Sequence, residues 1–390
     1  LVKKVGRPNS PLRSAPSRDS SNNRIAPPTI TLLKMTITIL PARLRLLHFS
    51  KSYLPHATHA IIKACFFDPS RSYFFSYTEN SLEVSIVTEV DFIENEFLPS
   101  LKAASSEIEF SKDLFRALQI DDDTGQNSSG QRISELSEPL ARSQFSIFYM
   151  STYQTDFVLV KEKRLTQVVT ALLRHGFELD QDSLKEHVPD LDQSSYLDYD
   201  RFDTASLSGS EDGFNGDAER HPTDQEFGAR WEKTVLANEL RCAGLNRDFM
   251  QSWALTVIKI LFYPELVAGY NPLVPRFFSY TATNDGISLI TDHYILQEFE
   301  EHMLNMNDST PLLRLIQVDL AGANLDRYGI VRSISQPLVS EAEINLLYLS
   351  TFKTANIIVS EEDLERAQEI LATDLEKAQR LLQNTGLAAD

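Results

Sequence analysis

The feature that most constrains the fold is an internal repeat that spans most of the chain. Four short strings occur twice in the same order, and the two copies of each lie roughly 200 positions apart. Ordered recurrence of this kind indicates two duplicated halves with similar folds. The matched strings are 74–78 with 277–281, 116–121 with 314–319, 136–140 with 334–338, and 151–153 with 350–352.

Each half of the sequence divides again into two modules. Stretches rich in β-branched and aromatic residues alternate with helical stretches in the order β-α-β-β-α-β. That order defines the ferredoxin-like unit and gives an α+β fold. We therefore expect four modules, called modules 1 to 4 below. Their predicted ranges are 35–105, 106–179, 228–305 and 306–385.

Two segments have compositions that do not suit a packed core. Residues 180–227 hold 14 acidic residues against three Lys or Arg. They cannot bury enough apolar surface to offset their ordering entropy, so we predict an acidic disordered linker, either a tether or a partner-binding tail. Residues 1–34 are basic and rich in Pro and Ser, similar to a transit peptide. Their prolines favour a disordered extension instead, and we expect the native chain to start at Met35.

Charge and composition exclude several classes of function. The net charge of −18 opposes binding to nucleic acid, including by an RNA-recognition module of the same β-α-β-β-α-β order, and docking to anionic membranes. No apolar run approaches the ~18 residues that a transmembrane helix needs. Cys65 and Cys242 make no disulfide framework, which favours a reducing compartment, and we expect both to be packing residues.

The sequence lacks the motifs of common enzyme classes. It has no P-loop, no nucleophile-elbow motif and no dinucleotide fingerprint. Its histidines show no metal-ligand spacing beyond His56 and His59, a pair without a Cys/His partner motif. We therefore expect a protein that is not an enzyme and that uses no cofactor and no metal.

Two hairpin segments carry a resemblance to a known family. The string Ser-Thr-Tyr-Gln-Thr-Asp-Phe at 151–157 and the segment 344–359, with its Ser-Thr-Phe, resemble the CASTOR family. The likeness runs from Met35 to the final helix. It implies the ACT fold, a cytoplasmic location and a role as a cytosolic arginine sensor in the pathway of the TOR kinase. A homodimer is left open.

The resemblance implies that one amino acid binds between modules 2 and 4. Backbone groups of module 2 would hold its amino-acid head, a turn of module 4 would close over it, and a strand end of module 4 would hold its side chain. Plainer interpretations are a solvent-facing strand position for Ser146 and a tight turn for Gly329. The expected ligand-binding residues are Ser146, Ile147, Asn324, Arg327, Gly329, Ile330, Thr351, Phe352 and Ala355.

The sequence departs from the family at three of these positions. Ala355 replaces an aspartate, Asn324 a glycine and Arg327 a glutamate. A charge-assisted hydrogen bond contributes roughly 1.5–3 kcal/mol, so loss of the aspartate alone would weaken guanidinium binding about ten- to a hundredfold. We expect the ligand to be arginine or another free amino acid, and a neutral or acidic one suits the altered charges better.

The resemblance also implies a surface for a protein partner. It would include Tyr153, Gln154 and Asp156, which we expect at an exposed hairpin tip. Ligand binding would release an inhibited protein complex that acts upstream of the TOR kinase. Two other functions stay open: a ligand-free scaffold that kept the fold, and a detached regulatory subunit of an amino-acid biosynthetic enzyme.

Overall fold

The computed structural model describes residues 35–67, 74–101, 108–122, 128–189, 191, 232–306, 311–320, 325 and 327–372. These described residues belong to one compact unit, to which the following description applies. The predicted extension 1–34, most of the predicted linker and the predicted ligand residue Asn324 lie outside the described residues. No helix in the described ranges is long and apolar enough to cross a membrane.

Modules 1 and 3 show the expected order of strands and helices. The elements of module 1 are β1 (Met35–Phe49), α1 (Leu54–Phe66), β2 (Phe74–Glu79), β3 (Val84–Glu89), the helical segments α2 (Val90–Phe92), η2 (Ile93–Phe97) and α3 (Leu98–Leu101), and β4 (Ile108–Phe110). Those of module 3 are β9 (Glu232–Leu245), α9 (Met250–Phe262), β10 (Phe278–Thr283), β11 (Ile287–Asp292), α10 (His293–Leu296) and β12 (Leu304–Asn305).

Modules 2 and 4 repeat this order as far as the described residues go. Module 2 comprises β5 (Phe115–Asp122), α4 (Ser129–Arg142), β6 (Ile147–Ser151), β7 (Asp156–Lys161), α5 (Leu165–Arg174), β8 (Glu178–Leu179) and α6 (Gln181–His187). Module 4 comprises β13 (Leu313–Asp319), α11 (Ile330–Gln336), the π-helical turn η9 (Pro337–Glu341), β14 (Leu346–Ser350), β15 (Thr354–Ser360) and a helix over 364–372. Short 3-10 turns cover Lys51–Tyr53, Glu162–Arg164, Arg247–Phe249, Pro264–Leu266 and Glu301–Met303.

Three boundaries differ from the sequence-based prediction. Strand β4 pairs with β1 of module 1, although it lies inside the range predicted for module 2. Helix α6 lies inside the range predicted as disordered linker. The Asp180 carboxylate caps it by accepting a hydrogen bond from the Ser183 amide at 2.9 Å, and Leu184 is buried where α6 packs on β1. Strand β1 is also shared between modules. Residues 35–39, 43 and 44 pair with β5 of module 2, and 36–37 pair with β8, whereas 44–49 pair with β3 of module 1.

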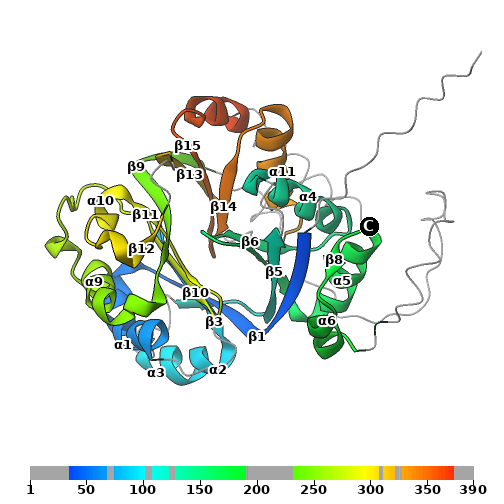
Figure 1. Cartoon of the computed structure of the whole chain (residues 1–390), viewed down its shortest axis with the longest axis horizontal. Helices are drawn as coiled ribbons and strands as arrows, with labels where there is room; N and C mark the ends of the chain where they lie inside the picture. The colour runs from blue at the N-terminus through cyan, green and yellow to red at the C-terminus, as the bar shows by residue number, and fades with distance from the viewer. Residues whose placement is uncertain are drawn as a thin grey trace, which may run out of the picture. The chain divides into compact units, whose positions relative to one another are not determined.

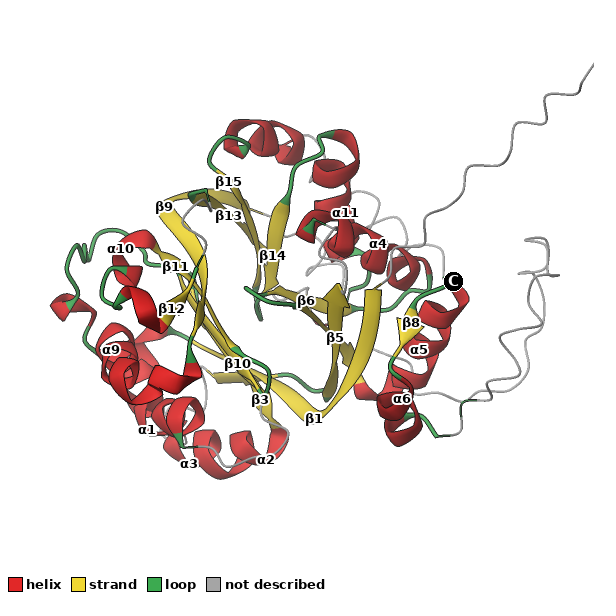
Figure 2. Cartoon of the chain, in the orientation of Figure 1, coloured by secondary structure: helices red, strands yellow, loops and turns green. Residues whose placement is uncertain are grey.

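The strands form one continuous sheet that closes on itself. Its order is β11-β10-β2-β3-β1-β5-β7-β6-β14-β15-β13-β9, and β9 pairs in turn with β11. Modules 1 and 3 therefore meet along β2 and β10, and modules 2 and 4 meet along β6 and β14. The helices lie along the outer faces of the strands in Figure 2.

The repeated strings of the sequence form the seams between modules. Strands β2 and β10, which carry the repeated Phe-Ser-Tyr-Thr, pair antiparallel with Tyr77 opposite Tyr280, and the hydroxyls of Ser76 and Thr281 lie 2.9 Å apart. Helices α4 and α11, which carry the matched strings at 136–140 and 334–338 (the latter running on into η9), pack against each other, as Figure 1 shows. Each of these two seams therefore brings the two copies of one repeated string together.

Three hydrophobic cores, formed by residues in the described part of the chain, hold this arrangement together. One lies under the helices of modules 1 and 3, one under those of modules 2 and 4, and a central one between the inner faces of the strands. Because both faces of the hairpin strands are covered, every residue of β2, β6, β7, β10 and β11 is buried. Cys65 and Cys242 are free and buried, which confirms their predicted packing role.

Candidate ligand site and the two docking hairpins

The predicted ligand site begins where the C-terminal end of α4 meets the turn before α11. The Ser146 hydroxyl donates a hydrogen bond of 3.1 Å to the backbone carbonyl of Leu325. The side chain of Gln144, two residues earlier, reaches the Tyr328 hydroxyl at 3.4 Å. The structure thus brings the predicted module 2 residue Ser146 against the predicted module 4 turn, so Ser146 is not a plain solvent-facing strand position.

The backbone at the start of α11 explains the glycine in this turn. Gly329 has φ 80°, a left-handed conformation that residues with a side chain rarely adopt. A Cβ at Gly329 would still lie 4.0 Å from the Ala141 side chain, so the conformation, and not crowding, selects glycine. Ile330 and Ile147 are buried on the two sides of the junction, and Arg327 is half-buried.

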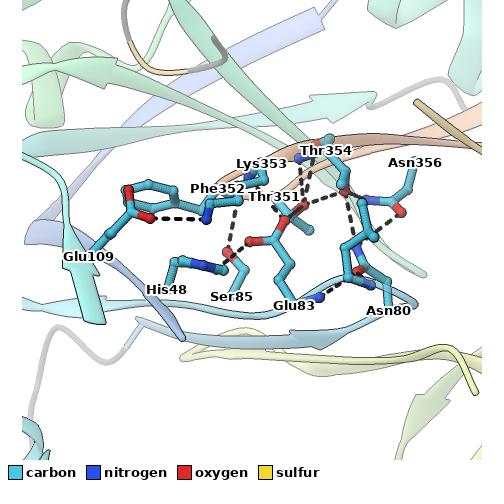
Figure 3. A network of polar contacts seen from close by, with 11 residues as sticks. His48, Asn80, Glu83, Ser85, Glu109, Thr351, Phe352, Lys353, Thr354 and Asn356 are labelled. Atoms are coloured by element: carbon cyan, nitrogen blue, oxygen red, sulfur yellow. Dashed lines mark hydrogen bonds and ion pairs between the residues drawn. The ribbon is translucent and has the colours of Figure 1, made fainter. Parts of the chain in front are cut away.

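The predicted residues Thr351 and Phe352 lie in the turn of the module 4 hairpin, which docks onto module 1 (Figure 3). The Thr351 hydroxyl donates to Glu83 Oε1 at 2.5 Å, and the Lys353 amide donates to the same oxygen at 2.9 Å. The Phe352 amide donates to the Ser85 hydroxyl at 3.1 Å. One buried carboxylate of module 1 therefore accepts two hydrogen bonds from a single turn of module 4.

A second layer of contacts surrounds the Glu83 carboxylate. His48 Nδ1 lies 2.8 Å from Glu83 Oε2, and the His48 ring stacks on Phe352 with 5.4 Å between ring centroids. Asn80 donates to the Thr354 hydroxyl at 2.9 Å and accepts a hydrogen bond of 3.0 Å from the Glu83 amide. The network links β1, the β2–β3 hairpin and the β14–β15 hairpin.

Ala355 faces a different core from Phe352. It is fully buried in the core under the helices of modules 2 and 4, whereas Phe352 packs in the central core, against which Leu325 also packs. Ala355 lies opposite Val318, and Asp319 lies opposite Thr354. Because successive residues of a strand point to opposite faces, the Asp319 carboxylate does not share the face of Ala355.

The equivalent hairpin of module 2 docks onto module 3. The Tyr153 amide donates to the Ser288 hydroxyl at 2.8 Å, which matches the Phe352–Ser85 contact of the other half. A Cβ at Gly244 would lie 3.0 Å from the Tyr153 ring, and one at Gly286 would overlap the Gln154 amide group. Two glycines of module 3 therefore make room for the side chains of this hairpin.

The expectation of an exposed tip is wrong for Asp156. This residue is fully buried at the start of β7, and its Oδ2 accepts a hydrogen bond of 2.7 Å from Arg132 Nε of α4. Burial raises the pKa of the Asp156 carboxyl, and the Arg132 guanidinium opposes that rise. Gln154 is exposed and Tyr153 half-buried, so the hairpin presents only part of the predicted partner surface.

Comparison with known proteins agrees with the observed fold and identifies the family of the chain. A model of the ACT domain matches residues 110–174 and 308–373, within modules 2 and 4. A protein of Rattus norvegicus named cytosolic arginine sensor for mTORC1 subunit 1 is 28% identical over 363 residues, which cover 87% of this chain and 99% of that protein. The protein of that name from Bos taurus is 26% identical over 350 residues, covering 86% and 97%. The human putative protein CASTOR3P is 34% identical over 120 residues, covering 29% of this chain and 69% of that protein. The chain belongs to the CASTOR family.

Within this CASTOR family member, three functional candidates were missed from the sequence. Glu83, His48 and Asn80 lie in module 1, far along the chain from the turn that they hold; Glu83 and Thr351 are 268 positions apart. A mismatch between the repeats was a signal for two of them, because Gly286 and Gly244 of module 3 occupy the positions that correspond to Glu83 and His48. No motif points to a buried carboxylate whose partners come from another module.

Proposed function

We propose that this CASTOR family member is a cytosolic sensor that binds a free amino acid between modules 2 and 4 and regulates a protein complex of the TOR pathway. All four modules would have the ACT fold, including modules 1 and 3. The observation that carries the proposal is the junction at which Ser146 of module 2 bonds to the Leu325 carbonyl of the module 4 turn. The full-length relatives named as arginine sensors support the same function.

The junction suits a small polar ligand for a physical reason. A ligand held by Ser146 and Ile147 on one side and by the turn over 327–330 on the other contacts two modules at once. It therefore stabilises the arrangement in which those modules are docked, by the difference in its affinity for the docked and undocked states. A partner complex that prefers the other arrangement would dissociate when the ligand binds.

The ligand would be arginine or another amino acid with a different side chain. Ala355 offers no carboxylate for a guanidinium, and Asp319 lies on the other face of the neighbouring strand. We therefore expect arginine to bind more weakly than it would with a carboxylate at position 355, by about tenfold or more. A neutral amino acid does not depend on that lost group.

A thermal-shift screen of the full chain against the twenty amino acids tests the proposal. A ligand at 100 times its dissociation constant adds about 2.7 kcal/mol to the stability of the folded state, which gives a visible shift. Ser146→Ala should reduce the response. Ser143→Ala, at an exposed residue just after α4, should leave it unchanged and is the matched control. If no amino acid shifts the transition, the chain is a ligand-free scaffold; if it copurifies with an amino-acid biosynthetic enzyme, it is a regulatory subunit.

A further inference from the structure

We infer that Glu83 and His48 of module 1 are positioning residues for the module 4 side of the ligand site. They would hold the Thr351–Thr354 turn in place, so that ligand affinity depends on a module that does not itself contact the ligand. The inference rests on the proposed function, because Thr351 and Phe352 are the turn residues that are expected to meet the ligand.

The geometry of the Glu83 carboxylate carries the first step. Its Oε1 accepts from the Thr351 hydroxyl at 2.5 Å and from the Lys353 amide at 2.9 Å, which fixes the turn at two points. Its Oε2 lies 2.8 Å from His48 Nδ1. Figure 3 shows the carboxylate between the His48 ring and the turn, with Oε1 toward the turn and Oε2 toward the imidazole.

Burial strengthens the contact between Glu83 and the turn. The side chain of Glu83 is fully buried and that of His48 is 7% exposed, so neither can exchange its partners for water while the modules are docked. A buried carboxylate that loses its donors keeps the cost of desolvation without compensation. The turn therefore cannot shift away from Glu83 without separating modules 1 and 4 locally.

The other half of the molecule shows that the turn itself does not need this carboxylate. In module 2 the turn closes with its own hydrogen bonds, from the Thr152 amide and the Thr152 hydroxyl to the Thr155 carbonyl at 3.0 and 2.6 Å. Glycines 244 and 286 of module 3 occupy the positions that correspond to His48 and Glu83. Glu83 is thus an addition on the side of the molecule that carries the expected ligand residues of the turn, and its role is to place the turn.

The consequence is a link between the ligand and the contact of modules 1 and 4. A ligand that bonds to Thr351 or Phe352 favours one position of the turn, and Glu83 favours that position from the opposite side. By thermodynamic reciprocity, weakening the Glu83 hold weakens the ligand, and ligand binding tightens the hold.

The test uses the full chain, with arginine and the strongest hit of the amino-acid screen as probes. Glu83→Gln keeps the size of the side chain and removes its charge. Calorimetric titration should show affinity reduced about tenfold, the effect of weakening a charge-assisted hydrogen bond. The double variant Glu83→Gln with Thr351→Val should lose less affinity than the sum of the two single losses, because the two changes share the Thr351–Glu83 hydrogen bond, while Glu83→Gln also weakens the bond from the Lys353 amide. Additive losses would overturn the role of Glu83 through Thr351.

Hydrogen exchange separates failure of this inference from failure of the proposed function. Glu83→Gln should speed exchange of the Lys353 amide, and the matched variant Ser288→Ala should speed exchange of the Tyr153 amide while ligand affinity stays within about twofold. Unchanged exchange at Lys353, or equal loss of affinity in the two variants, overturns the inference. If the parent chain binds no amino acid, the proposed function fails and the ligand role of Glu83 fails with it, whereas exchange at Lys353 still decides whether Glu83 holds the turn.

Discussion

The hairpin of module 2 and the hairpin of module 4 occupy corresponding places but are held by different chemistry. Both turns close on a threonine, and both donate a backbone amide to a serine of the module they dock on, Ser288 in one half and Ser85 in the other. Beside those serines, module 3 has glycines that receive Tyr153 and Gln154, whereas module 1 has the buried pair of His48 and Glu83. The duplication preserved the backbone contact and let the side chains beside it diverge.

A second difference lies at the base of the same hairpins. Module 2 has a buried ion pair between Arg132 and Asp156, and the corresponding positions of module 4, about 198 residues later, are Ile330 and Ala355. Both of those apolar residues belong to the expected ligand site. In module 2 the chain supplies its own guanidinium to a carboxylate, whereas module 4 has neither group. The module 2 position is therefore filled by an ion pair, whereas the corresponding position of module 4 is filled by apolar side chains of one hydrophobic core.

The largest effect is expected when one partner of the module 2 ion pair is removed. Arg132→Ile leaves the Asp156 carboxylate buried without its guanidinium and should cost about 3–5 kcal/mol in the free energy of unfolding. Adding Asp156→Ala, which copies module 4, should recover most of that loss. Urea denaturation measures both, and a double variant as unstable as the single one would show that the two halves do not correspond here.

The pH dependence of stability sharpens the same comparison. Because burial raises the pKa of Asp156 above its unfolded value, the folded chain keeps the proton to a higher pH. The contribution of this group is present below the ordinary carboxyl range and is lost as pH rises through the raised pKa. The parent should therefore lose stability relative to Asp156→Ala as pH rises above about 4. If the difference in stability between the parent and Asp156→Ala stays constant across pH, Asp156 does not have a raised pKa in the folded chain.

The next largest loss of stability is expected when the hydrogen bonds between Glu83 and the module 4 turn are removed. Glu83→Ala removes an acceptor of two hydrogen bonds in a fully buried place, so we expect a loss of about 2–3 kcal/mol in the free energy of unfolding. Glu109→Ala is the control, because its pair with Lys353 is exposed and should contribute less than about 1 kcal/mol. If denaturation gives the same loss of unfolding free energy for Glu83→Ala and Glu109→Ala, the buried contact is no stronger than the exposed one.

Substitution of Gly244 tests the packing of the module 2 hairpin against module 3. A valine there would meet the Tyr153 ring, since even a Cβ lies only 3.0 Å from it. We expect a cost of about 1–3 kcal/mol and faster hydrogen exchange at the module 2 turn. The module 4 turn should exchange at its normal rate, and simultaneous loosening of both turns would show that the hairpins are not held independently.

The smallest expected effects test what the two halves share. Ser85→Ala and Ser288→Ala each remove one backbone-to-hydroxyl hydrogen bond and should each cost about 1 kcal/mol. Thermal or chemical denaturation of the two variants in parallel is sufficient. Costs that differ by more than about 1 kcal/mol would mean that the serine contacts are not equivalent.

The sequence predicted the elements of the fold better than their partners. Repeated strings and strand composition indicated an α+β chain of duplicated halves, and the structure shows those strings at the seams, as with Tyr77 opposite Tyr280. The sharing of β1 between two modules was missed, because the alternation of a strand does not say which neighbours it pairs with. Helix α6 was missed because the acidic composition of 180–227 as a whole hid a short helix that is capped by Asp180 and buries Leu184.

The candidate site was predicted in part, for a similar reason. Ser146 and the turn before α11 came from the family resemblance, and the structure places Ser146 against Leu325. Glu83 and His48 could not be predicted, because a buried polar network is specified by residues far apart in the chain and has no local period. Asp156 was expected to be exposed because a turn-forming sequence does not reveal that Arg132 of a helix is its partner.

Hydrogen exchange of the full chain with and without its best amino-acid ligand tests the central claim most directly. The account predicts that ligand slows exchange on both sides of one junction, in residues 144–147 of module 2 and 327–331 of module 4, together with the turn at 351–354. Protection confined to one module, protection elsewhere in the chain, or no protection by any amino acid would contradict it.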